Sequence, residues 1–172
     1  EMMAAITPTD KPYLKTSVFE IWKKRLPWLL LLMISATFTT LIISSFESAL
    51  AAQLVLTSFI PMIMGTGGNS GSQSSVTIIR GLSLDEIEFS DILKVIWKET
   101  RVAILCGLTL AVANFFKLIL LEGVEVMVSL TISATLLITV LVAKVIGSSL
   151  PMLAKKIGFD PAVMASPLIT TM

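Results

Sequence analysis

Long runs without a charged side chain constrain this chain more than any other feature. One run covers residues 26–46, which are 21 residues, and another covers residues 48–79. A helix of the first length measures about 31 Å at about 1.5 Å per residue, enough to cross the hydrocarbon of a bilayer. Hydrophobic residues make up 55% of the 172 and charged residues only 15%, which excludes an ordinary soluble fold. We therefore predict an all-α, polytopic membrane protein.

The apolar runs also predict where the membrane spans lie. Four spans are expected at residues 26–46, about 49–79, 102–121 and 126–153. The second is expected to be bent or broken around Pro61 to Gly68, and the fourth has a bend site at Gly147 and Pro151. Residues 162–172 are 11 uncharged residues, about 16 Å of helix, so they are expected to be part of a truncated fifth span.

The polar segments between the runs set the expected orientation. Residues 1–25 form a basic amphipathic segment, which we expect to lie along the membrane surface or to join an upstream domain, and residues 80–101 form a long polar connection with one or two short helices. Ser17 with Glu20, and Ser83 with Glu86, have the spacing of a capping box. Five basic residues precede the first span and none separates it from the second, so the N-terminus is predicted to be cytoplasmic.

Two features of the composition narrow the chemistry. The sequence contains no histidine, which removes imidazole as a metal ligand, proton shuttle or catalytic base. The net charge is only +1, so the basic balance gives no reason to expect a nucleic-acid partner. The expected partner is the lipid bilayer.

The stretch GTGGNSGSQSS, residues 65–75, lies within an uncharged run and carries the candidate chemistry. A phosphate loop is disfavoured because the Lys-Ser/Thr ending is missing. An intramembrane serine hydrolase using Ser70 stays open but would need a base from outside this sequence. Helix packing through small residues, as in a non-conducting membrane anchor, is a third reading. The density of neutral oxygens favours a path for hydrated cations, because each oxygen can accept a hydrogen bond from ion-bound water.

Three stretches then identify a resemblance. PMIMGTGGNSGSQSSVTIIRGLS in the second span, WKE before the third and LPMLAKKIGFDPAVMASPLITT at the end resemble the membrane domain of MgtE-type magnesium channels. The likeness covers nearly the whole chain in order. It implies a magnesium-selective channel with no enzymatic activity, carrying Mg²⁺ into the cytoplasm across a membrane that is expected to be a bacterial inner membrane. Mn²⁺ is the expected substitute ion.

The resemblance also implies an architecture and a set of ligands. It implies five spans per protomer and a homodimer with the pore on its twofold axis. It further implies missing N-terminal cytoplasmic regulatory domains, with residues 1–25 as the end of a connecting helix and residues 26–172 as the pore domain. The ligands implied for Mg²⁺ are Gly65, Gly68, Asn69, Ser72 and Thr170. Ser72 departs from the Asn of some members, and the family's central pore acid would lie beyond Met172.

Two acidic residues form a further expected cation site. Glu99 precedes the third span and Asp160 precedes the fifth, so the predicted topology brings both to the cytoplasmic face. Each also has a simpler role, Asp160 as a helix N-cap before Pro161 and Glu99 as a surface partner of nearby basic residues. Two carboxylates at an inner mouth would concentrate divalent cations and could bind a partly hydrated Mg²⁺.

Overall fold

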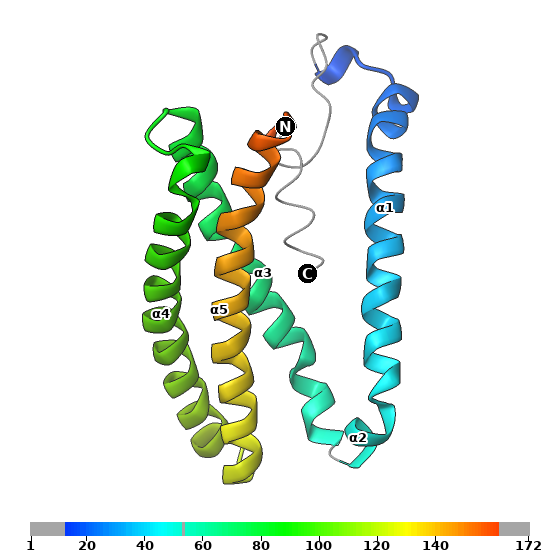
Figure 1. The fold of residues 1–172 in the computed structure, drawn as a ribbon. Coiled ribbons are helices and arrows are strands. Elements are labelled where there is room, and N and C mark those ends of the chain that lie inside the picture. The colour runs from blue at the N-terminus through cyan, green and yellow to red at the C-terminus, as the bar shows by residue number, and fades with distance from the viewer. Residues whose placement is uncertain (1–12, 53, 162–172) are drawn as a thin grey trace.

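The computed structural model describes residues 13–52 and 54–161, which form helices joined by short turns (Figure 1). No strand occurs within these two ranges. The elements in chain order are η2 (Tyr13–Lys15), α1 (Val18–Ser45), α2 (Glu47–Ala52), α3 (Leu54–Ser83), η3 (Phe89–Asp91), α4 (Ile92–Leu121) and α5 (Val126–Lys156). The predicted all-α class is confirmed.

Three helical segments of the described residues are long and apolar enough to cross a membrane. They are Val18–Ser45, Phe89–Leu121 and Val126–Lys156. The fourth long helix, α3, has 30 residues and carries the polar stretch 65–75 in its middle. The chain is therefore a polytopic membrane protein; the predicted third and fourth spans lie within two of the three segments, and the predicted first span passes the end of its segment by one residue. The predicted fifth span lies outside the described residues.

Helices α3, α4 and α5 form a bundle in which α5 packs against both of the others. In Figure 1, α3 and α5 run in one direction and α4 runs in the other.

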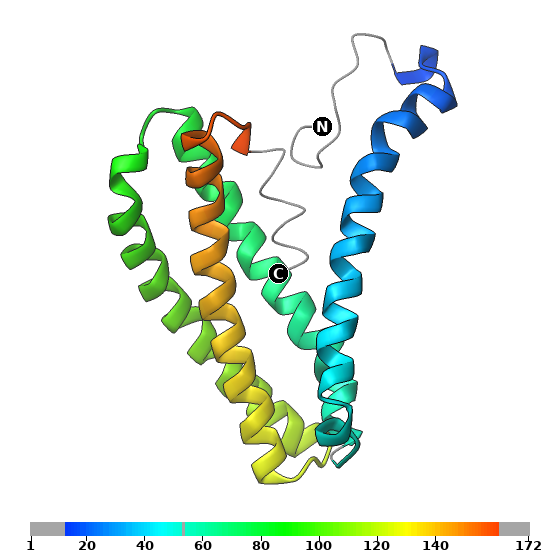
Figure 2. The ribbon, with the colours of Figure 1, turned by 45° about the vertical axis from the view of Figure 1, so that its right-hand side comes forward.

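Helix α1 has no buried residue and stands apart from α4 and α5 in both views (Figures 1 and 2). Its N-cap is Ser17, whose side chain accepts a hydrogen bond from the Glu20 N–H at 3.3 Å, as the capping-box spacing predicts. The basic residues 23–25 and the first predicted span share this one helix.

The second span, expected to be bent or broken around Pro61 to Gly68, is not broken, because α3 is a single helix from Leu54 to Ser83. Pro61 lacks an N–H and so removes one backbone hydrogen bond from the helix, which the rest of the ladder tolerates here. The glycines that follow keep their backbone hydrogen bonds inside the helix, since hydrocarbon offers no alternative partners. Helix α5 likewise continues past Gly147 and Pro151.

The predicted long polar connection is also much shorter than expected. Helix α3 extends to Ser83 and α4 begins at Ile92, so only residues 84–91 connect them. The extra turns are held by a small apolar core in which Val95 of α4 packs with Ile78, Leu82 and Met152. Ser83 is the last residue of α3, where its hydroxyl donates to the Ile79 carbonyl, and it does not start a helix.

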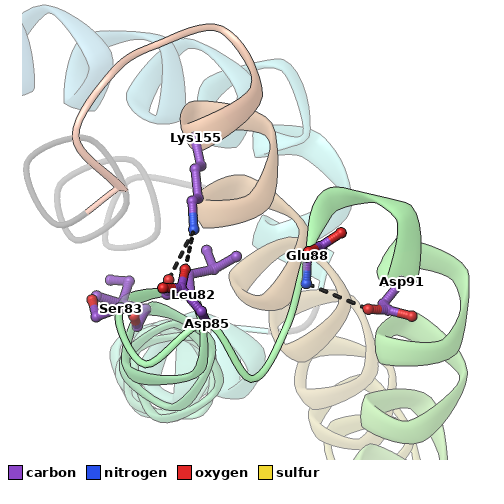
Figure 3. Close-up of polar contacts among 7 residues, drawn as sticks. Leu82, Ser83, Asp85, Glu88, Asp91 and Lys155 are labelled. Carbon is purple, nitrogen blue, oxygen red and sulfur yellow. Dashed lines mark hydrogen bonds and ion pairs between the residues drawn. The ribbon is translucent and has the colours of Figure 1, made fainter.

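The end of the bundle near this connection carries a polar cap over α3. The Lys155 ammonium donates to the Leu82 carbonyl at 2.8 Å and lies 3.7 Å from the Asp85 carboxylate (Figure 3). The last carbonyls of a helix have no partner within it, so a basic side chain from a neighbouring helix satisfies one of them. At the opposite end, the short turn predicted at Glu122 is present, with Gly123 at φ +65.

Candidate functional site

Helix α3 presents two different faces. Its buried face packs against α5 and consists mainly of small residues, namely Gly67, Ser70, Gly71, Ser74, Ser75, Ile78, Gly81 and Leu82. The two helices come very close at Gly147 of α5, where an added Cβ would overlap the backbone of Gly71. Small residues at such a crossing let two membrane helices come close together. The packing interpretation therefore accounts for this half of the polar stretch.

The other face of α3 is open. Gly65, Asn69 and Gln73 are exposed, and Gly68 and Ser72 are half-buried. Among the residues that the structure describes, a Cβ added at Gly65 or Gly68 would meet nothing within 4 Å. At 100° per residue these positions lie roughly opposite the face that packs on α5. Contacts among the described residues thus explain neither the two glycines nor the polar side chains beside them.

This open face brings together four of the residues predicted from the sequence. Gly65, Gly68, Asn69 and Ser72 lie on it within about two turns of helix. A helix face of this kind offers amide and hydroxyl oxygens, which are hard neutral ligands suited to the water shell of a divalent cation. Thr170 lies outside the described residues.

The two predicted acidic residues have different surroundings. Glu99 lies within α4, past its second turn, and its carboxylate accepts a hydrogen bond from the Ser74 hydroxyl at 2.5 Å. Asp160 is exposed and follows the end of α5. No cluster of three or more His, Cys, Asp or Glu side chains that could hold a metal ion occurs in the described part of the chain. The proposed role of Glu99 and Asp160 in cation binding stays a prediction.

Ser70, the candidate nucleophile, lies on the closed side of α3. Its exposed fraction is 7%, and the residue belongs to the buried face that packs against α5. A serine nucleophile needs an adjacent general base and access for its substrate. The sequence contains no histidine to serve as that base. The geometry of Ser70 therefore fits helix packing.

Sequence reasoning missed a polar chain that links three helices. The ammonium group of Lys144 on α5 donates to the Ser74 hydroxyl of α3 at 3.3 Å, and Ser74 in turn donates to Glu99 of α4. Lys144 is 5% exposed and Ser74 is 2% exposed. The available signal was the presence of Lys144 in an otherwise uncharged run, since an ionisable side chain inside a membrane span is rarely without a role.

A second buried polar contact lies between α4 and α5. The Asn114 amide donates to the Ser133 hydroxyl at 3.4 Å, and both residues are buried. Hydrogen bonds of this kind between membrane helices contribute about 0.6 kcal/mol on average. This pair explains why two polar residues lie inside the spans without belonging to the open face of α3.

The chain matches one protein family and several curated proteins. The MgtE family profile, described as a divalent cation transporter, matches residues 60–172. The chain is 32% identical over 170 residues to the magnesium transporter MgtE of Thermus thermophilus. This alignment covers 99% of this chain and 37% of that protein. It is 35% identical over 149 residues to the magnesium transporter MgtE of Bacillus subtilis, covering 87% of this chain and 33% of the relative.

A third relative gives the same result. The magnesium transporter MgtE of Enterococcus faecalis is 35% identical over 152 residues, with 87% of this chain and 33% of the relative covered. The chain therefore spans about a third of the length of the curated relatives it matches. The profile match includes all of the polar stretch 65–75 and the whole of α4 and α5.

Proposed function

The chain belongs to the MgtE family of divalent cation transporters, and from that premise we propose that it forms the membrane part of a magnesium channel whose ion path follows the open face of α3. The observation that carries the proposal is the division of α3 into a closed, small-residue face and an open, polar face. Only the open face is free to meet an ion, because the residues of the closed face pack against α5.

The chemistry of the open face suits hydrated Mg²⁺. This ion releases its water reluctantly and usually keeps several waters in an octahedral shell. Neutral oxygens of Asn69, Ser72 and Gln73 can accept hydrogen bonds from that shell, while Gly65 and Gly68 leave room for it and expose backbone. The path thereby binds the ion weakly enough for it to leave again. Mn²⁺ is the substitute ion that we propose.

A single open helix face is one wall of a path, so a second copy of the chain is proposed to supply the other. Closed twofold dimers are the commonest oligomers, and a path on the symmetry axis would be lined by the same residues of both protomers. Thr170 is proposed to join this lining from the fifth span. Cytoplasmic regulatory domains upstream of residue 25, an N-terminus in the cytoplasm, and inward transport across a bacterial inner membrane complete the proposal.

Asp160 is proposed to attract cations at the cytoplasmic mouth. It is exposed at the end of the bundle that also carries the connection between α3 and α4. An exposed carboxylate there raises the local concentration of divalent cations and can bind one through water. The cation-binding role predicted for Glu99 is left out of this proposal, because its carboxylate accepts the hydrogen bond from Ser74.

The two alternative functions explain less of the structure. A serine hydrolase is disfavoured because Ser70 is buried against α5 and the family is one of transporters and not of enzymes. A non-conducting anchor explains the closed face of α3 but gives no reason for the polar side chains and glycines on the open face. Ion flux separates the channel from both alternatives.

The test is magnesium uptake into proteoliposomes that contain the protein or its Asn69→Leu variant. Replacing the amide removes hydrogen bonds to a charged group, each about 1.5–3 kcal/mol, so the flux should fall about tenfold or more. Thermal stability should stay nearly unchanged, because Asn69 is exposed and packs against nothing that the change would disturb.

Thr109→Leu is the matched control, since it also replaces an exposed polar side chain by leucine, but on α4. This control should retain its flux. Normal flux in the Asn69→Leu variant would refute the assignment of the ion path to the open face of α3. An absence of magnesium flux in the unmodified protein would favour the non-conducting anchor.

A further inference from the structure

Lys144 is a charged side chain buried inside α5. Only 5% of it is exposed, and it lies well within a helix that is long and apolar enough to cross a membrane. Placing an unpaired charge at such a position costs several kcal/mol. Ionisable residues inside membrane spans therefore usually pair with another polar or charged group. Lysine could reach the membrane surface from near a helix end, but the ammonium group of Lys144 is directed to Ser74.

The partner of Lys144 is reached through a hydroxyl. The Ser74 hydroxyl accepts from the ammonium at 3.3 Å and donates to the carboxylate of Glu99 at 2.5 Å. A serine hydroxyl has one donor and can accept as well, so Ser74 uses both capacities here. The result is a hydroxyl-bridged pair of opposite charges that links α3, α4 and α5. Lys144 is buried and Glu99 is half-buried, and their opposite charges offset each other.

The bridge lies directly behind the open face of α3. Ser74 follows Ser72 and Gln73 in sequence but belongs to the face that packs on α5. It is also three residues after Gly71, while Lys144 is three residues before Gly147, so the bridge is beside the close crossing of the two helices. A change in this bridge would thus alter both the rotation of α3 and the electrostatic potential at its open face.

We infer that Lys144 and Glu99 are positioning residues for the ion path. The bridge through Ser74 fixes α3 so that its polar face points away from α5, and Glu99 neutralises the ammonium of Lys144 behind that face. This inference rests on the proposed function. A lysine left without its carboxylate would repel a divalent cation beside α3, and in a medium of low effective dielectric one such charge changes ion occupancy about tenfold or more.

The inference distinguishes charge balance from simple helix packing. Replacing both members of a buried ion pair by neutral groups of similar size is often harmless, whereas removing one member leaves an uncompensated charge. A bridge that only holds the helices together would change the thermal stability of each variant. A bridge that also balances charge would change how flux depends on magnesium concentration. Neutralising the second charge as well would then restore the original dependence.

The experiment compares Glu99→Gln, Lys144→Met and the double variant in proteoliposomes. Initial flux is measured against magnesium concentration, together with thermal unfolding in detergent. Glu99→Gln should lower the flux about tenfold or more, chiefly by raising the half-saturating magnesium concentration, because the charge of Lys144 is then unbalanced. Lys144→Met should also perturb flux. The double variant should return to within about twofold of the unmodified protein, because both charges are removed together.

Lys94→Met is the matched control, because Lys94 is a highly exposed lysine on α4 that pairs with Asp91. This control should keep the flux of the unmodified protein. A double variant that folds but stays as impaired as Glu99→Gln would overturn the inference and indicate that Glu99 contacts the ion itself. If either charge variant fails to fold, Ser74→Ala removes only the bridge, and unchanged flux in that variant would likewise overturn the inference.

Failure of this inference can be told apart from failure of the proposed function. An unmodified protein without magnesium flux would contradict the proposed function. A second combination of results would contradict only the role of Lys144 and Glu99. In it, Asn69→Leu loses flux, and the double variant of Glu99 and Lys144 stays as impaired as Glu99→Gln.

Discussion

At the scale of single residues, the glycines of α3 have two different structural roles. Gly67 and Gly71 lie on the closed face, where a side chain at Gly67 would collide with Thr139 and the backbone of Gly71 meets Gly147. Gly65 and Gly68 lie on the open face and have no neighbour within 4 Å of an added Cβ. The same residue type therefore permits close helix packing on one side and leaves space on the other.

This division predicts opposite effects of alanine at two glycines. Gly147→Ala should lower the free energy of unfolding by about 1–3 kcal/mol, because its new methyl group would overlap the backbone of Gly71, which cannot move without shifting a helix. Gly68→Ala should cost nothing, since the added methyl group meets open space and alanine favours helix over glycine by about 1 kcal/mol. Thermal and denaturant unfolding in detergent measure both. Equal stability of the two variants would contradict the assigned crossing point.

At the scale of the elements, α5 organises the bundle by contacting both α3 and α4. It contributes Gly147 to the crossing with α3, Ser133 to the contact with α4, and Lys155 to the C-terminal end of α3. The ammonium of Lys155 lies between the Leu82 carbonyl and the carboxylate of Asp85, as Figure 3 shows. The end of α3 is thereby held by a neighbouring helix as well as by its own backbone cap, in which the Glu86 N–H donates to the Gly81 carbonyl at 2.9 Å and Asp85 has a φ of +54.

Lys155→Met should therefore loosen the last turn of α3. The variant loses a charged hydrogen bond to the Leu82 carbonyl, and because Lys155 is half-exposed the expected loss in unfolding free energy is about 1 kcal/mol. Amide hydrogen exchange in residues 79–85 should become faster. Asp85→Asn is the control, with an expected change within about 0.5 kcal/mol, because the Asp85 carboxylate is 91% exposed and 3.7 Å from the ammonium. A larger effect of Asp85→Asn than of Lys155→Met would contradict this account.

At the scale of the whole molecule, most of the basic residues lie at one end of the bundle. The end that holds the connection between α3 and α4 carries most of the basic residues, including Arg80, Lys155 and Lys156. The opposite end carries Lys117 and the acidic residues Glu47, Glu122 and Glu125. Lysine and arginine favour the cytoplasmic side of a membrane protein, so this distribution supports a cytoplasmic location for the first end.

The orientation can be tested by cysteine labelling in intact cells. Cys106 is exposed on α4 and must first be replaced by serine. In that background, a cysteine at Glu122 should react with a membrane-impermeant maleimide added outside the cell, and a cysteine at Asp85 should react only after the cells are opened. Both positions are exposed, so burial would not account for a missing signal. The reverse labelling pattern would invert the proposed direction of the bundle.

The sequence by itself determined the class of this protein and the residues of its candidate path. Charge-free runs as long as a bilayer is thick leave few structures other than membrane helices, and the run of glycine, serine and asparagine within one of them marks where polar chemistry is concentrated. The helix ends were harder to predict, since packing of Val95 with Leu82 and Met152 extended α4 beyond the uncharged run. Proline and glycine suggested a bend or a break in α3, and no break occurs, because the helix keeps its backbone hydrogen bonds within itself.

Only the tertiary structure decided which polar residues face each other. In sequence, Asn69 and Ser70 are neighbours with similar polarity, yet one is exposed and the other is buried, because the crossing of α3 with α5 fixes the rotation of α3. Local patterns carry no information about that rotation when both faces of a helix are built from small and polar residues. The link from Lys144 through Ser74 to Glu99 likewise joins residues 70 and 25 positions apart, and it exists only because three helices meet at that point.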